Sequence, residues 1–197
     1  IRDRSIHSSF LENGSDAVET NTFGANSLVL AEFGLEGDTR KLNQEAAEIA
    51  RAACVAAGGP RYVLGSIGPG TRLLTLGQTD WSAMHASYRR QIEGLLDGGV
   101  DALLVETCQD PLQIRCAVHA ALHALEARGM GPEQLPIMVS VTVETTGTLL
   151  VGSEISAVAS TLRRLPVASL GLNCATGPAE MTPHVEWLAK HWDRPIS

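Results

Sequence analysis

The pattern of apolar and polar positions alternates between helix-like and strand-like segments along the chain. Apolar residues at helical spacing, with caps and glycine stops, predict helices over residues 4–13, 25–33, 42–57, 81–96, 111–128, 154–165 and 178–192. Short apolar runs predict strands over residues 16–23, 62–67, 102–106, 137–143 and 167–173, and a sixth strand beginning at 195–197. Strands separated by such helices form parallel sheets through βαβ units. The pattern therefore predicts an α/β protein, either an open doubly wound sheet or part of a (β/α)8 barrel.

One predicted helix has an especially clear start. Asp110 is a capping residue type, Pro111 takes the first helical position, and Gln113 stands three residues after the cap, as in a capping box. Ser153 is the expected cap of the helix at 154–165. The run at 102–106 (ALLVE) is almost continuously apolar, which suits a parallel strand that is buried on both faces.

Composition narrows the class of protein. With 197 residues and 44% hydrophobic content, the chain can form one well-buried core. Its net charge of −7 argues against nucleic-acid binding, which needs a basic excess. No apolar run reaches the roughly 18 residues of a membrane span, and no basic-then-apolar leader opens the chain. We therefore expect a cytoplasmic protein with neither nucleic acid nor membrane as a partner. Because the chain starts at Ile1 and ends inside a strand-like segment, we also expect a piece of a longer protein.

The four cysteines do not indicate a disulfide framework, and none of them forms a CxxC pair. Cys54 and Cys116 fall within predicted helices and are expected in the core. Cys174 falls at a strand-to-helix turn, where a free cysteine is either a small buried side chain or a functional thiol. Cys108 is a weaker case of the same kind.

Polar or turn-forming residues follow four of the five predicted strands, at the point where each strand ends. These segments are residues 19–22, 68–70, 106–108 and 173–174. In parallel α/β folds, ligands bind at the carboxyl ends of the strands. A carboxylate, amides, hydroxyls and thiols that meet there indicate a small polar substrate, with a soft metal as an option.

Glu106 is the most informative of these polar residues, because it ends a strongly apolar strand. One interpretation is a partly buried carboxylate that holds a substrate ammonium group or acts as a base. The alternative is a helix cap or a surface ion pair with an arginine. Since Asp110 already supplies a cap nearby, the functional interpretation is favoured.

Two other motif candidates give weaker evidence of function. The loop at 65–72 is rich in glycine, but it lacks the Lys-Ser/Thr pair of a P-loop and the spacing of a dinucleotide fingerprint, so it is interpreted as a wide turn that shapes the pocket. The six histidines fall within predicted helices. His119 and His123 form an i, i+4 pair without an acidic partner, which favours a solvated helix face over a metal site.

Four short motifs together resemble one family. ETNTFGAN (19–26), RYVLGSIGP (61–69), VETCQDPLQI (105–114) and SLGLNCATGP (169–178) are similar, in order, to the homocysteine-binding domain of cobalamin-dependent methionine synthases. The resemblance implies a (β/α)8 barrel. Compared with that family, the chain lacks the first strand and the C-terminal strands with their Cys-Cys turn. We therefore expect a partial barrel of about five complete strands over residues 1–197.

The resemblance also implies the chemistry. In the family, three cysteines hold a zinc ion and the homocysteine thiol takes the fourth position, where it is deprotonated. By this match Cys174 is the first zinc ligand and Glu106 holds the substrate amino group. Thr20, Asn21, Thr22 and Asn173 are implied to line the pocket. With one of the three cysteines, this chain alone is expected to bind zinc weakly or not at all and to be inactive.

The implied reaction transfers a methyl group from methylcobalamin to homocysteine, which gives methionine. Methyltetrahydrofolate recharges the cobalamin on other modules of the same polypeptide. Two alternatives stay open. One is a cobalamin-independent homocysteine S-methyltransferase that uses S-methylmethionine or betaine. The other is an inert binding or scaffold piece.

Overall fold

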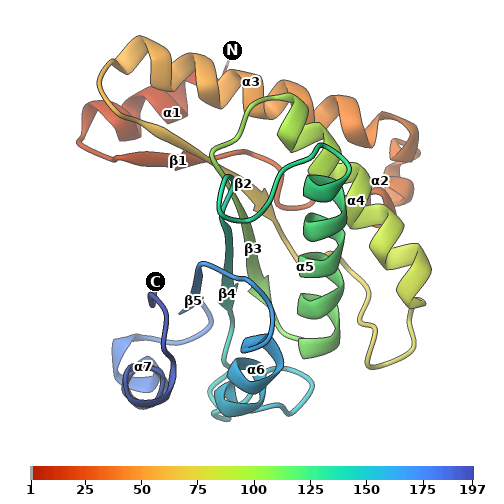
Figure 1. The fold of residues 1–197 in the computed structure, drawn as a ribbon, viewed down its shortest axis with the longest axis vertical. Helices are drawn as coiled ribbons and strands as arrows, with labels where there is room; N and C mark the ends of the chain where they lie inside the picture. The colour runs from red at the N-terminus through yellow and green to blue at the C-terminus, as the bar shows by residue number, and fades with distance from the viewer. Residues whose placement is uncertain (1) are drawn as a thin grey trace.

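The computed structural model describes residues 2–197 and contains a sheet of five parallel strands (Figure 1). The strands are β1 (Ala17–Glu19), β2 (Tyr62–Ile67), β3 (Ala102–Cys108), β4 (Ile137–Val141) and β5 (Ser169–Leu172). They pair in chain order, and every neighbouring pair is parallel. The predicted α/β class is confirmed. Strand order without a reversal is the order of a (β/α)8 barrel, whereas a doubly wound sheet reverses at a switch point.

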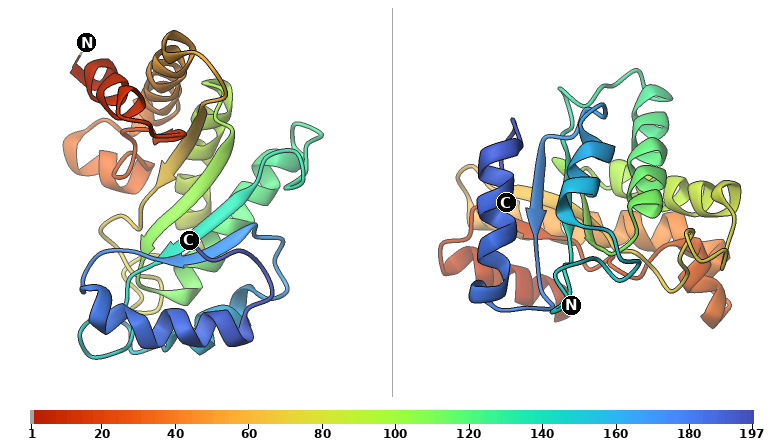
Figure 2. Two further views of the ribbon diagram at one scale, coloured as in Figure 1. Left: turned by 90° about the vertical axis from the view of Figure 1, so that its left-hand side faces the viewer. Right: turned by 90° about the horizontal axis from the view of Figure 1, so that it is seen from below.

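The helices follow one another around the convex side of this sheet (Figures 1 and 2). They are α1 (Arg2–Glu12), α2 (Ser27–Leu30), α3 (Thr39–Ala57), α4 (Trp81–Asp97), α5 (Pro111–Glu126), α6 (Ile155–Leu162) and α7 (Pro178–His191). Within residues 2–197, no helix covers the concave side of the sheet. None of the described helices has both the length and the apolar character needed to cross a bilayer.

The two faces of each strand have different surroundings, because successive side chains point to opposite faces. Val63, Ile67, Leu103 and Val139 lie fully buried in the core with the helices. Residues of the other face line a hollow of about 540 Å³ near the amino ends of the strands, among them Tyr62, Leu64, Ala102, Pro136 and Met138. The concave face is therefore apolar at the amino end and open to solvent.

Two N-terminal elements are shorter than predicted. The strand expected at 16–23 ends at Glu19, because the chain then turns, with hydrogen bonds from Thr22 N to Thr20 O and from Ala25 N to Thr22 O. The helix expected at 25–33 is the four-residue α2, capped by the Asn26 side chain, followed by a 3₁₀ turn at Ala31–Phe33. A second 3₁₀ turn at Glu36–Asp38 leads into α3.

Differences also occur in the C-terminal part. The predicted cap Ser153 is wrong: Glu154 precedes α6, and its side chain makes no capping hydrogen bond. Residues 195–197 are not a strand, yet the carbonyls of Pro195 and Ser197 accept hydrogen bonds from the Leu170 and Leu172 amides. The chain therefore continues the ladder along the free edge of β5, as the expected start of a sixth strand would.

At the start of α5, Asp110 is the cap and Pro111 takes the first helical position, as predicted, but Gln113 does not complete a capping box. Asp110 is fully buried, and its carboxylate accepts hydrogen bonds from Leu112 N, Thr75 N and Thr75 Oγ1. Gln113 does not reach back to the cap. Its Nε2 donates instead to the carbonyls of Pro69 and Arg72, so it anchors the glycine-rich loop.

Candidate functional site

A row of polar side chains crosses the sheet at the carboxyl ends of the strands. Each strand or the residue just after it contributes one member: Glu19, Ser66, Glu106, Ser140 and Asn173. Hydrogen bonds join neighbours in this row, from Ser66 Oγ to Glu106 Oε1 and from Ser140 Oγ to Asn173 Oδ1. The hollow of about 540 Å³ described above lies at the opposite ends of the strands, and its lining is mainly apolar, with Asp101 and Ser169 as its polar members.

Glu106 lies at a bulge in β3, where the register with β4 shifts between Val105 and Cys108. Its side chain is partly buried, and it accepts hydrogen bonds from Ser66 Oγ at 2.5 Å and from Thr107 Oγ1 at 3.4 Å. No lysine, arginine or histidine forms an ion pair with it among the described residues. Since Asp110 caps α5 and no ion pair includes Glu106, the helix-cap and surface-ion-pair alternatives are removed among the described residues.

Glu19 is a second carboxyl at this end, which the motif analysis placed in a polar run but did not select. Glu19 is exposed, yet reduced hydration at the strand end, the negative charge of Glu106 and a hydrogen bond between the two side chains raise the pKa of Glu19 above its usual value. Two carboxyls that share a site disfavour ionisation of both, so a cationic ligand would relieve their repulsion.

Thr20 and Thr22 are buried and serve the backbone of β2. The Thr20 and Thr22 hydroxyls lie 2.6 Å apart, Ser66 N donates to Thr20 Oγ1, and Thr22 Oγ1 donates to Ser66 O. They therefore fix Ser66, which in turn holds Glu106. Asn21 is exposed and lines a hollow of about 550 Å³ between β1 and α1.

Cys174 is the exposed cysteine of the chain, whereas Cys54, Cys108 and Cys116 are buried. Its Sγ lies 3.4 Å from Thr142 Oγ1 and 3.5 Å from Asn173 Nδ2. Its φ of 45° is in the left-handed region that disfavours side chains, as is the φ of 56° at Ala175. The thiol thus sits at the strand-to-helix turn, as predicted, and faces polar groups.

The other cysteines behave as buried apolar side chains. Burial, with the nearby Glu106 and Asp110 carboxylates, raises the pKa of Cys108 far above its usual range. Burial raises the pKa of Cys116 to about 12. The core positions predicted for Cys54 and Cys116 are confirmed, and Cys108 is not available as a ligand near neutral pH.

The described residues do not by themselves form a zinc site. A catalytic zinc site needs three protein ligands, and no three His, Cys, Asp or Glu side chains within residues 2–197 are grouped to hold a metal. The exposed Cys174 thiol is suited to zinc as a single soft ligand. The donor set is therefore incomplete.

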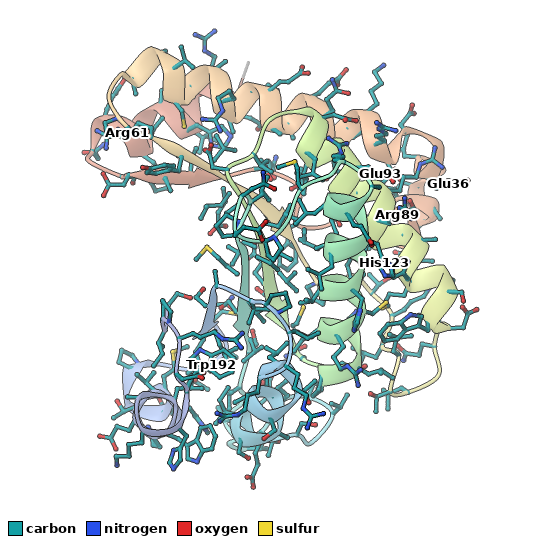
Figure 3. The ribbon with its side chains drawn as sticks, viewed as in Figure 1. Glu36, Arg61, Arg89, Glu93, His123 and Trp192 are labelled. Carbon is teal, nitrogen blue, oxygen red and sulfur yellow. The ribbon has the colours of Figure 1, made fainter. Side chains whose placement is uncertain are left out.

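The predicted histidine pair lies away from this site, between two outer helices. His119 is partly buried and His123 is exposed on α5, and His123 Nδ1 lies 2.9 Å from Nε2 of His85 on α4 (Figure 3). Burial lowers the pKa of His85 and of His119.

Four further residues connect the site. Sequence reasoning missed Ser66, Ser140 and Thr142, and it placed Thr107 in a polar segment without selecting it. A signal exists for three of them. Ser140 and Thr142 alternate with the buried valines of β4, and Ser66 alternates in the same way in β2. Thr107 reaches Asn173 only because of the bulge in β3, and no local sequence pattern predicts that bulge.

Comparisons with known proteins agree with this arrangement. The profile of a family described as homocysteine S-methyltransferase matches residues 4–197. Methionine synthase of Mycobacterium tuberculosis is 47% identical over 195 residues, which is 98% of this chain and 16% of that protein. The chain thus spans about a sixth of that relative.

Among solved structures, the homocysteine methyltransferase MmuM of Escherichia coli is similar in its oxidized and metallated forms. The TM-scores are 0.79 and 0.77, with 24% identity, 98% of this chain covered and 68% and 69% of the MmuM chains covered. At this identity the likeness concerns the fold, which is a partial (β/α)8 barrel. With its profile match over nearly the whole length, the chain belongs to the homocysteine S-methyltransferase family.

Proposed function

We propose that this chain is the homocysteine-binding part of a methyltransferase that forms methionine. Glu106 holds the ammonium group of homocysteine, and Cys174 lies where the substrate sulfur is bound. The observation that carries the proposal is the connection of Glu106 and Cys174 by one hydrogen-bond network through Thr107 and Asn173. This network lies at the end of the sheet where such folds bind their ligands.

The electrostatics of the site favour an ammonium group. Glu106 is partly buried and has no cationic partner among the described residues, and Glu19 adds a second carboxyl beside it. A hydrogen bond between an ammonium group and a carboxylate is stronger than one between neutral groups. Ser66 and the two threonines behind it, Thr20 and Thr22, keep the carboxylate in place.

The proposal also includes a zinc ion and methylcobalamin as the methyl donor. We assign Cys174 as one zinc ligand and the remaining ligands to residues outside 2–197, since Cys174 is the exposed thiol of this chain. The metallated form of MmuM supports a metal in the family. The identity of 47% to a methionine synthase, against 24% to MmuM, supports methylcobalamin as donor over S-methylmethionine or betaine, with methyltetrahydrofolate recharging it on other modules.

We further propose that a longer polypeptide supplies the first strand and the C-terminal strands of the barrel. Ile6, Phe10, Ala17 and Val18 are among the residues that line the hollow beside β1, at the free edge of the sheet. A strand placed there would cover the exposed Ile6 and Phe10 and pair with β1. The 16% coverage of the mycobacterial methionine synthase supports further modules.

Homocysteine binding by the full-length protein tests the proposal. We define the amino-group ratio as the Kd of 4-mercaptobutyrate, which lacks the amino group, divided by the Kd of homocysteine. Calorimetry should give a ratio of about 10 to 100 for the natural protein, because a charged hydrogen bond is worth about 1.5–3 kcal/mol. Glu106→Gln should bring the ratio near one and keep the zinc content, whereas Cys174→Ala should lower the zinc content.

Two results would count against the proposal. An unchanged ratio in Glu106→Gln would remove Glu106 from the ammonium site. Absence of homocysteine binding by the natural full-length protein would favour an inert binding or scaffold piece.

A further inference from the structure

The side chain of Asn173 links the strand end that carries Glu106 to the strand end that carries Cys174. Its Oδ1 accepts hydrogen bonds from Thr107 N at 3.3 Å and from Ser140 Oγ at 2.7 Å. Its Nδ2 donates to Thr107 Oγ1 at 2.8 Å and to Cys174 Sγ at 3.5 Å. One amide thus contacts three strand ends, those of β3, β4 and β5.

The orientation of this amide is fixed. Thr107 N–H can only donate, so the atom of Asn173 that faces it must be the oxygen. Both acceptor positions of Oδ1 and both hydrogens of Nδ2 then have partners within the protein, although the contact with sulfur is long. Little hydrogen-bonding capacity of Asn173 is left for a substrate.

The residues on either side of this link have unfavourable backbone conformations. Thr107 has a φ of 57°, which is rare for a β-branched residue, and Cys174 has a φ of 45°. Such conformations are unfavourable and persist only where the surrounding structure holds them. The two bonds from Asn173 to Thr107 supply such a hold at the bulge, one residue from Glu106.

We infer that Asn173 is a positioning residue that sets the separation of the Glu106 carboxylate and the Cys174 sulfur, rather than a residue that contacts the substrate. This rests on the proposed function, because a fixed separation matters for a ligand with an ammonium group at one end and a thiol at the other. Loss of the link would let the bulge and the turn at Cys174 relax separately. Substrate with both groups would then lose more affinity than a ligand with the thiol alone.

A double-mutant cycle in the full-length protein tests the link. Asn173→Ala should lower the amino-group ratio at least fivefold, although Glu106 is still present. Thr107→Gly removes the backbone strain that Asn173 is proposed to hold in place, since glycine adopts a positive φ freely. In the Thr107→Gly background, Asn173→Ala should therefore change the ratio less than twofold. The matched control is Asn13→Ala, an exposed asparagine that bonds to Ser9 O on α1 and should leave the ratio unchanged.

A second readout does not depend on homocysteine. Peptide mass spectrometry measures the rate at which Cys174 is alkylated. This rate should change threefold or more in Asn173→Ala, because the turn and the sulfur lose a hydrogen-bond partner. Asn173→Ser removes the amide without adding charge, so it serves if the alanine variant does not fold. It should lower the amino-group ratio and change the alkylation rate in the same way.

The outcomes separate the two proposals. Failure of the natural protein to distinguish homocysteine from 4-mercaptobutyrate would overturn the proposed function. A natural ratio of ten or more that Glu106→Gln abolishes, but that folded Asn173→Ala and Asn173→Ser both leave unchanged, would overturn the positioning role alone. Equal effects of Asn173→Ala with and without Thr107→Gly would also overturn it, because the strain at Thr107 would then play no part.

Discussion

At the scale of single residues, each functional side chain is held by a neighbour from another strand. Ser66 on β2 orients Glu106 on β3, and Thr142 after β4 contacts Cys174 after β5. Position at a strand end favoured a functional interpretation of Glu106 and left Cys174 open, and only the family resemblance selected Cys174 as a ligand. Neither could identify their partners, because contacts between strands depend on register, and the register of β3 shifts at the bulge.

Glu19 predicts a specific dependence of stability on pH. Its raised pKa means that the folded state favours the protonated form. This contribution is present below the usual glutamate pKa of about 4.3 and is lost as pH rises through the raised value. Glu19→Gln stays neutral, so its free energy of unfolding relative to the natural chain should increase from pH 4 to pH 7 in urea titrations.

The control for this measurement is Glu12→Gln, on the exposed end of α1. Its free energy of unfolding should follow that of the natural chain at both pH values. Parallel pH dependence of Glu19→Gln and the natural chain would contradict the coupling of Glu19 to Glu106.

The cysteines predict selective labelling. In the folded chain, Cys174 should react with iodoacetamide at least about 100-fold faster than Cys108 or Cys116, since burial suppresses both access and thiolate formation at the latter two. Peptide mass spectrometry of a time course measures this. Comparable rates at Cys108 and Cys174 would show that the strand ends are not packed as described.

At the scale of elements, local signals predicted most helices and strands, and failed where distant contacts decide. Asp110 and Pro111 were sufficient to place the start of α5. Gln113 has the spacing of a capping box, but its side-chain amide donates to carbonyls of the loop at 68–72 instead of to the cap. The strand β1 is short because the chain turns after Thr20, whose amide still bonds to Leu64 O, while Thr22 N bonds back to Thr20 O.

Asp110 predicts a large loss of stability at the start of α5. Its carboxylate is fully buried with three hydrogen bonds, so Asp110→Ala should lower the free energy of unfolding by about 3 kcal/mol. Asp80→Ala removes the exposed cap of α4, with a single bond to Ala83 N, and should cost about 1 kcal/mol. If urea denaturation gave the same loss of unfolding free energy for Asp110→Ala and Asp80→Ala, a stabilising contribution of the Thr75 contacts would be contradicted.

At the scale of the whole molecule, the barrel is partial and its polar end is already assembled. The α/β class follows from the alternation of segments, and the barrel order and the family agree with what the four motifs implied. Helix positions agree except for the short α2 and the start of α6. The proposed zinc site could not be predicted in full, because no three His, Cys, Asp or Glu side chains are grouped to hold a metal among residues 2–197. The proposal therefore assigns the ligands other than Cys174 to residues outside this range, where spacing within 2–197 gives no information.

The most direct test of the central claim is protection of Cys174 by homocysteine in the full-length protein. Homocysteine should slow iodoacetamide labelling of Cys174, and the concentration for half-protection should rise at least tenfold in Glu106→Gln. An equal concentration of 4-mercaptobutyrate consumes the reagent similarly but lacks the ammonium group, so it controls for reagent loss and should protect at least tenfold less well. Labelling of Cys174 that saturating homocysteine slows no more than 4-mercaptobutyrate does would contradict a ligand held between Glu106 and Cys174.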